Sequence, residues 1–283
     1  MNNKKQLQEE YTSFKSLIRD LVLITREDKL VFRGVSNLNQ LNPKINRVST
    51  SDGITDLSSK EFDLLYRFRK FALSYMNGNL DFLDIVAYAQ HFGLPTRLID
   101  WSRNPFVALF FACAFSRGNE PVYLFYTDLE DHTIINSNHS DSVGDYIMIN
   151  KDFISEYSTF LDSLENIEGL MEAVESNNKY LLNLGIVNDS HVRKEGLIFY
   201  ECNASNPRLI AQQGLFSIPV SIKNNESKEE ILSKSNKTKI ILTDLERNQL
   251  LSYLNNMNYN GIRLFPDIQS ICLNIVNDTL NTR

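Results

Sequence analysis

The chain has few cysteines, and they lie far apart. Cys113, Cys202 and Cys272 are the three cysteines among 283 residues. They are odd in number and widely spaced, and Cys113 lies in an apolar run, so they do not form a disulfide framework. The cysteine content therefore favours a reducing compartment, and we expect a cytoplasmic protein.

Familiar metal-binding patterns are also missing. The four histidines never stand four residues apart, and the sequence contains no Cys-x-x-Cys pair. Paired ligands at such spacings hold the metal in common zinc sites. We therefore expect no bound metal.

Two common catalytic motifs are absent as well. The sequence contains neither a Gly-x-Ser-x-Gly motif nor a glycine-rich phosphate-binding loop of standard spacing, which disfavours a serine hydrolase and a P-loop enzyme. The N-terminal segment is interrupted by Glu9, Glu10 and Asp20, and a bilayer-spanning helix needs roughly 20 apolar residues. We expect neither an export signal nor a membrane anchor.

The overall charge is acidic. A formal net charge of −6 argues against a broadly basic nucleic-acid-binding surface, so any phosphate contact must be local. Hydrophobic residues make up 42 % of the chain, enough for a sizeable core in one large domain or two smaller ones.

Hydrophobic periodicity predicts helices and strands in an irregular order. Helices are expected within 1–25 and over 60–76, 81–90, 106–115, 243–256 and 267–276, and strands over 29–33, 121–126, 196–202, 208–218 and 239–242. Residues 128–145 and part of 223–237 are expected to be loop, and 151–183 an insertion or lid. Without a regular βαβ alternation, the sequence predicts one α+β domain over 1–283, with a mixed, largely antiparallel sheet, a buried central helix and surrounding helices.

The stretch from Gln90 to Ala114 is the richest in candidate functional residues. Gly93 and Pro95 end the preceding helix, and Pro105 begins an uncharged helix of about ten residues that belongs in the core. The intervening segment is thus held at both ends, which suits a binding site. Its candidate binding residues are Gln90, Thr96, Arg97, Asp100 and Trp101.

Each of these residues also has a structural interpretation. Arg97 and Asp100 fit an internal ion pair, and His91, near a helix end, fits a hydrogen-bonded core histidine. Arg33, at a strand end beside Gly34, offers a planar fork for phosphate or carboxylate, or it pairs with an acid. If residues 208–218 form a strand, only one of Gln212 and Gln213 points inward.

Several of these residues occur together in a known family. The sequence resembles the FRG domain, which occurs mainly in bacteria and their mobile elements, over most of its length. The resemblance is carried by Phe32-Arg33-Gly34, by Leu41, Pro43 and Arg47, by the run from Gln90 to Ala112, by Arg208, Gln212, Gly214 and Phe216, and by Leu264 to Asp267. The family resemblance alone implies no particular reaction.

A more distant resemblance, to ADP-ribosyltransferases, implies NAD as the substrate and no metal. In those enzymes an Arg or His on a first strand, a strand leading into a helix, and a Gln or Glu on a later strand form the site. The candidate catalytic residues are then Arg33, His91 and Gln213, and the candidate nucleotide-binding residues are Gly34, Arg47, Gln90, Thr96, Arg97, Asp100, Trp101, Arg208 and Gln212. The late segment lacks a Glu, for which Glu195 or Glu201 is the available substitute.

A second class of function fits the same residues. They also suit a non-catalytic module that binds a nucleotide or a protein partner in a phage-defence or toxin system, and a nuclease or other hydrolase is a third option. A small-molecule ligand and a protein target are therefore both expected as partners, a membrane is not, and nucleic acid stays open as an acceptor.

Overall fold

The computed structural model describes residues 6–24, 29–48, 57–72, 82–116, 119–136, 196–202, 206–219, 222 and 225–280. The expected lid at 151–183 and Glu195 lie outside these residues. None of the described helices is both long enough and apolar enough to cross a membrane.

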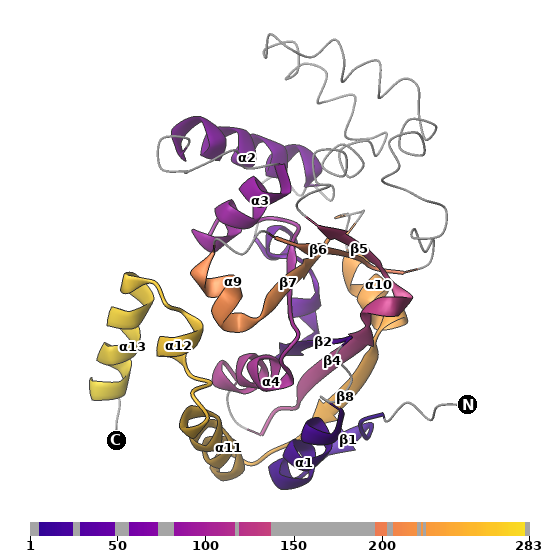
Figure 1. Ribbon diagram of the computed structural model, residues 1–283, viewed down its shortest axis with the longest axis vertical. Coiled ribbons are helices and arrows are strands. Elements are labelled where there is room, and N and C mark those ends of the chain that lie inside the picture. The colour runs from indigo at the N-terminus through magenta and orange to yellow at the C-terminus, as the bar shows by residue number, and fades with distance from the viewer. Residues whose placement is uncertain are drawn as a thin grey trace.

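A mixed sheet runs through the molecule (Figure 1), with the strand order β1-β8-β4-β2-β3-β7-β6-β5. The strands are β1 (Glu10–Tyr11), β2 (Leu30–Val35), β3 (Ile99–Ser102), β4 (Val122–Asp128), β5 (Thr133–Asn136), β6 (Ile198–Glu201), β7 (Gly214–Ser217) and β8 (Asn236–Ile240). The outermost pairs, β1 with β8 and β5 with β6, are parallel, and the other neighbouring pairs are antiparallel. The predicted α+β class with a largely antiparallel sheet is confirmed.

Helices surround the sheet. The α-helices are α1 (Phe14–Ile24), α2 (Ser58–Ala72), α3 (Phe82–His91), α4 (Pro105–Ala114), α9 (Pro207–Gln212), α10 (Glu226–Lys234), α11 (Asp244–Asn256), α12 (Gly261–Leu264) and α13 (Ile268–Leu280). Short 3-10 turns are η1 (Leu38–Leu41), η2 (Lys44–Arg47) and η4 (Leu129–Asp131). In Figure 1, α4 lies near the centre, with α2 and α3 above it and α1 and α11 below.

Helix α4 is the predicted buried central helix. The Asn104 side chain accepts from the backbone N–H of Phe106, and Pro105 occupies the first turn, where its missing N–H costs nothing. The helix packs so closely on β2 that a Cβ added to Gly34 would lie 1.7 Å from the carbonyl oxygen of Ala108. Only a glycine fits there. Phe115, predicted to be the last buried residue, lies after the helix and is exposed.

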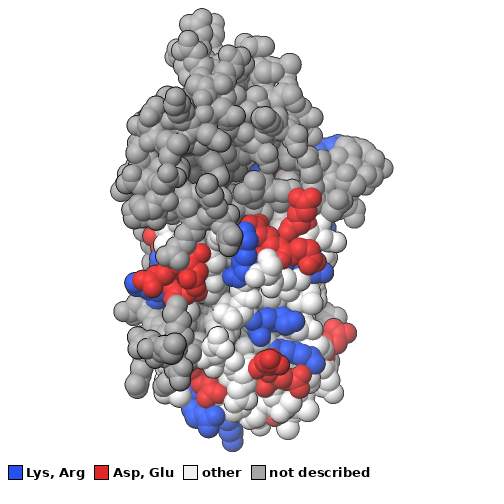
Figure 2. Space-filling model, turned by 90° about the vertical axis from the view of Figure 1, so that its right-hand side faces the viewer, with Lys and Arg blue, Asp and Glu red and all other residues white. Residues whose placement is uncertain are grey.

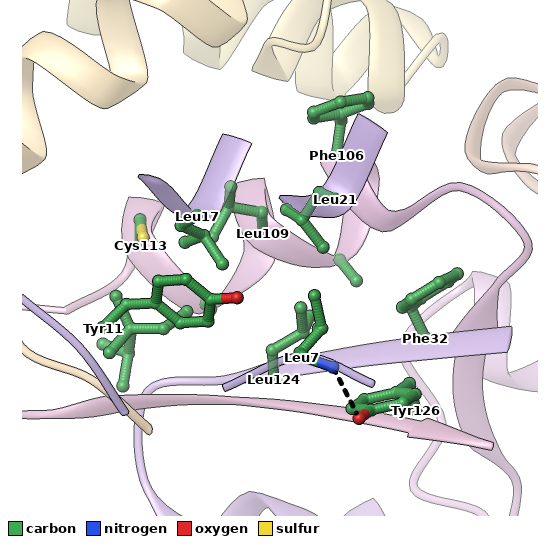
Figure 3. Close-up of a cluster of buried hydrophobic side chains, with 14 of the residues drawn as sticks. Leu7, Tyr11, Leu17, Leu21, Phe32, Phe106, Leu109, Cys113, Leu124 and Tyr126 are labelled. Atoms are coloured by element: carbon green, nitrogen blue, oxygen red, sulfur yellow. Dashed lines mark hydrogen bonds between the residues drawn. The ribbon is translucent and has the colours of Figure 1, made fainter. Parts of the chain in front are cut away.

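The N-terminal segment enters the core differently from the prediction. Figure 3 shows Leu7 and Tyr11 packed with α1 side chains against α4 and β4. The backbone N–H of Leu7 donates to the hydroxyl of Tyr126 at 3.1 Å. Within the described residues the helix begins only at Phe14, because Glu10–Tyr11 pairs with β8 as an edge strand. Val22, expected on the buried face, is exposed.

Two later predictions were also wrong. Residues 208–218 form a helix, α9, followed by strand β7, instead of one strand. Asn206 and Pro207, which resemble a turn between strands, act as the cap and first residue of α9: the Asn206 side chain accepts from the Arg208 N–H. The region expected to be loop over 128–145 contains η4 and β5. Residues 223–237, expected to be partly loop, contain α10. The antiparallel pairing of β6 with β7 is as expected for these two strands.

Candidate functional site: a cationic cleft

The site forms where β2 and β3 meet. These strands share one register pair, Phe32 with Ser102, whereas each pairs more extensively with its other neighbour. The next residue along β2, Arg33, extends its guanidinium from one strand to the other. Its Nη1 donates to the backbone carbonyl of Asp100, and its Nη2 donates to the carbonyl of Gln40 at 2.7 Å. Arg33 therefore connects β2, β3 and η1.

Two adjoining cavities open beside Arg33. We call the first, of about 180 Å³, the polar cavity; its walls include Asn42, Lys44, Gln90, His91 and Asn206. We call the second, of about 220 Å³, the aromatic cavity; its walls include Phe32, Trp101, Val107, Phe111 and Phe115. Both cavities are lined by Arg33, Arg47, Asp100, Arg208 and Gln212. They are thus two parts of one cleft.

The charge of the cleft differs from that of the whole chain. The polar cavity is lined by four Lys or Arg residues, Arg33, Lys44, Arg47 and Arg208, and by one carboxylate, Asp100. The chain carries a net charge of −6. On the face shown in Figure 2, basic and acidic groups lie interspersed. The positive charge is therefore concentrated locally, as a site for an anion requires.

Buried polar atoms without partners gather at the polar cavity. Arg33 Nε, Asn42 Oδ1 and His91 Nδ1 are buried and make no hydrogen bond within the described part of the chain. All three residues line the polar cavity. An unsatisfied buried polar atom costs about 1–3 kcal/mol, so native proteins keep such atoms mainly where they have a functional use. This clustering makes the polar cavity the candidate site.

The electrostatics of the cleft show how closely the cations are placed. Burial lowers the pKa of Arg33 to about 10, an effect that the carboxylate of Asp100 opposes and the charge of Arg47 reinforces. Burial also lowers the pKa of Arg47, again opposed by Asp100. Both guanidinium groups are charged at neutral pH. An anion in the cleft would offset their desolvation and mutual repulsion.

The half-buried His91 is set to be neutral. Its pKa lies below the ordinary histidine value because of burial and the charge of Arg208, while Asp267 acts in the opposite direction. Arg208 also stacks over the ring of Phe265, with 4.6 Å between the guanidinium carbon and the ring centroid. Arg208 is thus held in place where it faces both the cleft and His91.

Most of the residues predicted to form a site do come together. Arg33, Gly34, Arg47, Gln90, His91, Asp100, Trp101, Arg208 and Gln212 all line one or both cavities. They come from β2, η2, α3, β3 and α9, so residues far apart in the sequence share one cleft.

Three predicted residues have other positions. Thr96 is buried and donates through Oγ1 to Gln90 Oε1, so it supports a wall of the cleft. Arg97 lines neither cavity; its Nε pairs with Glu61 at 2.7 Å, and its backbone N–H donates to the same carboxylate. The structural interpretation therefore applies to Arg97, with Glu61 as its partner.

Gln213 was predicted to lie on a strand, but it does not. Its side chain is exposed and lines neither cavity. It ends α9 in the left-handed conformation, with φ 47°. Its carbonyl oxygen accepts from the Arg103 N–H at 3.0 Å. Glu201, the suggested substitute for a late-strand Glu, pairs with Arg103 and also lines neither cavity.

Comparison with protein families finds a match over part of the chain. The family model of the FRG domain matches residues 28–120. An FRG domain is thus present over these residues. The match includes the wall residues from Phe32 to Phe115, while Arg208 and Gln212 lie beyond it. No curated protein and no solved structure matches the chain.

Several wall residues were not predicted from the sequence. Asn42 and Lys44 flank Pro43 in the LNPKINR segment, from which only Arg47 was chosen as a candidate. Phe111 and Phe115 were assigned to the core, although they line the aromatic cavity. The signal that could have indicated Phe111 is that helix 106–115 is uncharged on every side. One side of such a helix can line a cavity while the others pack in the core. Within the described residues, no group of three or more His, Cys, Asp or Glu is placed to hold a metal.

Proposed function

We propose that the cleft of this FRG-domain protein binds a nucleotide. The phosphates lie against Arg33, Arg47 and Arg208, and a planar ring occupies the aromatic cavity. The observation that carries the proposal is that a polar and an aromatic cavity share these three arginines. A nucleotide combines the same two chemistries in one molecule.

The physical chemistry of each part fits this ligand. Arginine presents a planar fork of N–H donors that matches the oxygens of a phosphate. Aromatic side chains stack with flat rings, and each such contact contributes about 1–3 kcal/mol when the ring is a nucleobase. Ligand pockets commonly have volumes of roughly 300–1,000 Å³. The two cavities, about 180 and 220 Å³, suit one ligand that extends through both.

Calorimetric titration with ADP and NAD tests this proposal. Arg47 is the best residue to change, because it is exposed at the junction of the cavities. Arg47→Ala should weaken nucleotide binding at least about tenfold, since it removes a charge-assisted contact. The matched control is Arg19→Ala, which removes an exposed arginine of α1 that lines neither cavity. Equal affinity in the wild type and Arg47→Ala would reject the proposal.

A second candidate, ADP-ribosyl transfer from NAD, is favoured by the position of Asp100. Asp100 lines both cavities, where its carboxylate would face the ribose that joins the phosphates of NAD to nicotinamide. Nicotinamide leaves with the electron pair of the glycosidic C–N bond, and the carboxylate stabilises the positive charge that develops on the ribose. An acceptor oxygen then attacks the same carbon and loses its proton. Asp100 thus takes the part that the missing late-strand Glu has in the enzymes this chain resembles.

Release of nicotinamide separates this candidate from a binding module. The protein is incubated with NAD and bacterial extract, and Asp100→Asn is compared with the wild type. Transfer requires nicotinamide release that falls at least about a hundredfold in the variant. NAD binding without release in the wild type identifies a non-catalytic module. If the protein acts as a toxin or in phage defence, its expression also arrests bacterial growth, and Asp100→Asn relieves the arrest.

A further inference from the structure

Asp100 is a carboxylate at a site that otherwise suits an anion. It is exposed, it lines both cavities, and its charge opposes the lowering by burial of the pKa of Arg33 and of Arg47. Toward a bound phosphate, however, a carboxylate is repulsive. A site that recognised phosphate alone would have a higher affinity for it without the Asp100 carboxylate. The presence of this carboxylate therefore indicates a ligand group that donates hydrogen bonds.

The carboxylate is held in a fixed orientation. Gln90 Nε2 donates to Asp100 Oδ1 at 3.0 Å, and Gln90 Oε1 accepts from the Thr96 hydroxyl. Thr96 is fully buried, and its Oγ1 accepts from the backbone N–H of Leu98 at 3.3 Å. A chain of hydrogen bonds therefore runs from the core to Asp100. This arrangement is typical of recognition groups, which must be oriented before the ligand arrives.

The backbone of Asp100 is fixed at the same time. Its carbonyl oxygen accepts from Arg33 Nη1, and the residue is paired in register with Phe216 of β7. The phosphate-binding arginine is thus bonded directly to the backbone of the residue that carries the carboxylate. Their separation is set by the strands, so the cleft presents an anion-binding group and a hydrogen-bond acceptor at a constant spacing.

We infer that Asp100 accepts hydrogen bonds from the hydroxyl groups of a sugar attached to the phosphate, so that the cleft takes ribosyl phosphates in preference to bare phosphates. This inference rests on the proposed function. Two neighbouring ribose hydroxyls can donate to one carboxylate, as acidic residues do for the ribose in dinucleotide-binding folds. Asp100 is then the residue that determines specificity for the sugar.

The competing explanation is that Asp100 only offsets the charge of Arg33 and Arg47. The two explanations predict different effects of removing the carboxylate. If it only offsets charge, every phosphate-bearing ligand binds more tightly to the variant by a similar factor. If it binds hydroxyls, bare diphosphate binds more tightly while a ribosyl diphosphate binds less tightly.

The experiment titrates the full chain with ADP, 2′,3′-dideoxy-ADP and inorganic diphosphate. The wild type should bind ADP about tenfold or more tightly than the dideoxy compound, which lacks both hydroxyls. In Asp100→Asn this preference should fall to about twofold or less, and inorganic diphosphate should bind at least about threefold more tightly. Asparagine has nearly the same shape as aspartate and can still accept from Gln90, so the strand pairing is retained.

A second variant tests the positioning role of Gln90. Gln90→Ala releases the carboxylate without removing it, so the preference for ADP over the dideoxy compound should fall by a larger factor than any change in the affinity for inorganic diphosphate. Equal wild-type affinities for ADP and the dideoxy compound overturn the inference, as does a uniform increase for all three ligands in Asp100→Asn. If no ligand binds, or Arg47→Ala binds diphosphate like the wild type, the proposed function itself fails and the inference falls with it.

Discussion

Arg33 on β2 donates a hydrogen bond to the backbone carbonyl of Asp100 on β3. The two residues that contribute opposite charges to the cleft therefore also form a contact between the two strands at its edge, beside the pair of Phe32 with Ser102. Arg33 has a structural role and an electrostatic role at once. Substitutions of Arg33 and of Arg47 should consequently have different effects.

Arg33→Ala is expected to destabilise the fold. The change leaves the carbonyl groups of Asp100 and Gln40 without their donor, and the loss of two hydrogen bonds to a charged group costs roughly 2–4 kcal/mol. Arg47→Ala should cost less than about 1 kcal/mol, because that residue is exposed. Urea unfolding of both variants gives the comparison. Equal stabilities would show that Arg33 does not support the strands.

Gly34→Ala should destabilise the protein through a backbone clash. The added Cβ would lie 1.7 Å from the Ala108 carbonyl oxygen, so α4 must move away from β2, at a cost of about 2–4 kcal/mol. Gly93→Ala is the matched control. Gly93 has φ +98°, but its Cβ would meet only Lys44 Nζ at 4.0 Å, and the strain should cost about 1 kcal/mol. Thermal unfolding should place Gly34→Ala below Gly93→Ala.

The ion pair between Glu61 and Arg97 should support the fold and not the ligand. The two side chains are 3 % and 9 % exposed, and removing one member of a buried pair costs about 3–5 kcal/mol. Glu61→Ala should therefore unfold at a lower urea concentration, while the protein that remains folded keeps its nucleotide affinity. A tenfold loss of affinity in folded Glu61→Ala would instead place this pair in the site.

His91 should make ligand binding depend on pH. Its pKa is lowered by burial and by Arg208, against the opposing effect of Asp267, so the free protein holds the ring neutral at pH 7. A bound diphosphate favours the protonated ring. The affinity for NAD, whose diphosphate does not titrate near neutrality, should therefore rise as the pH falls below about 6.5. In His91→Asn this rise should disappear; its persistence would assign the effect to another group.

The same shift has the opposite effect on stability. A histidine whose folded-state pKa is lowered binds fewer protons when folded than when unfolded. Its contribution to stability is complete above the ordinary histidine pKa of about 6.5 and is lost as the pH falls toward the folded-state value. Unfolding measured without ligand should show this loss in the wild type and not in His91→Asn.

The sequence predicted the elements whose signals are local. The uncharged run that begins after Pro105 is the buried helix α4, and Thr243 with Glu246 forms the expected capping box. Asn206 and Pro207 were misinterpreted because the same two residue types begin turns and begin helices. The Ile that follows them in α9 also favours strands. Local propensity could not separate these alternatives.

The sequence predicted many of the residues that line the cleft, but not the contacts that they make. Arg33, His91 and Arg208 were chosen from residue type and position, and they do line one cavity. Nothing local shows that Arg97 pairs with Glu61, 36 residues earlier, or that Asn42 Oδ1 lacks a partner. Both facts depend on tertiary packing. Gln213 was chosen for its place in a strand that does not form, so it fell outside the cleft.

The most direct test of the account is a crystal structure of the protein with bound ADP. The account predicts that the diphosphate lies within hydrogen-bond distance of Arg33, Arg47 and Arg208, that a ribose hydroxyl donates to Asp100, and that adenine packs against Phe111 in the aromatic cavity. A nucleotide bound elsewhere, with this cleft unoccupied at saturating ADP, would contradict it.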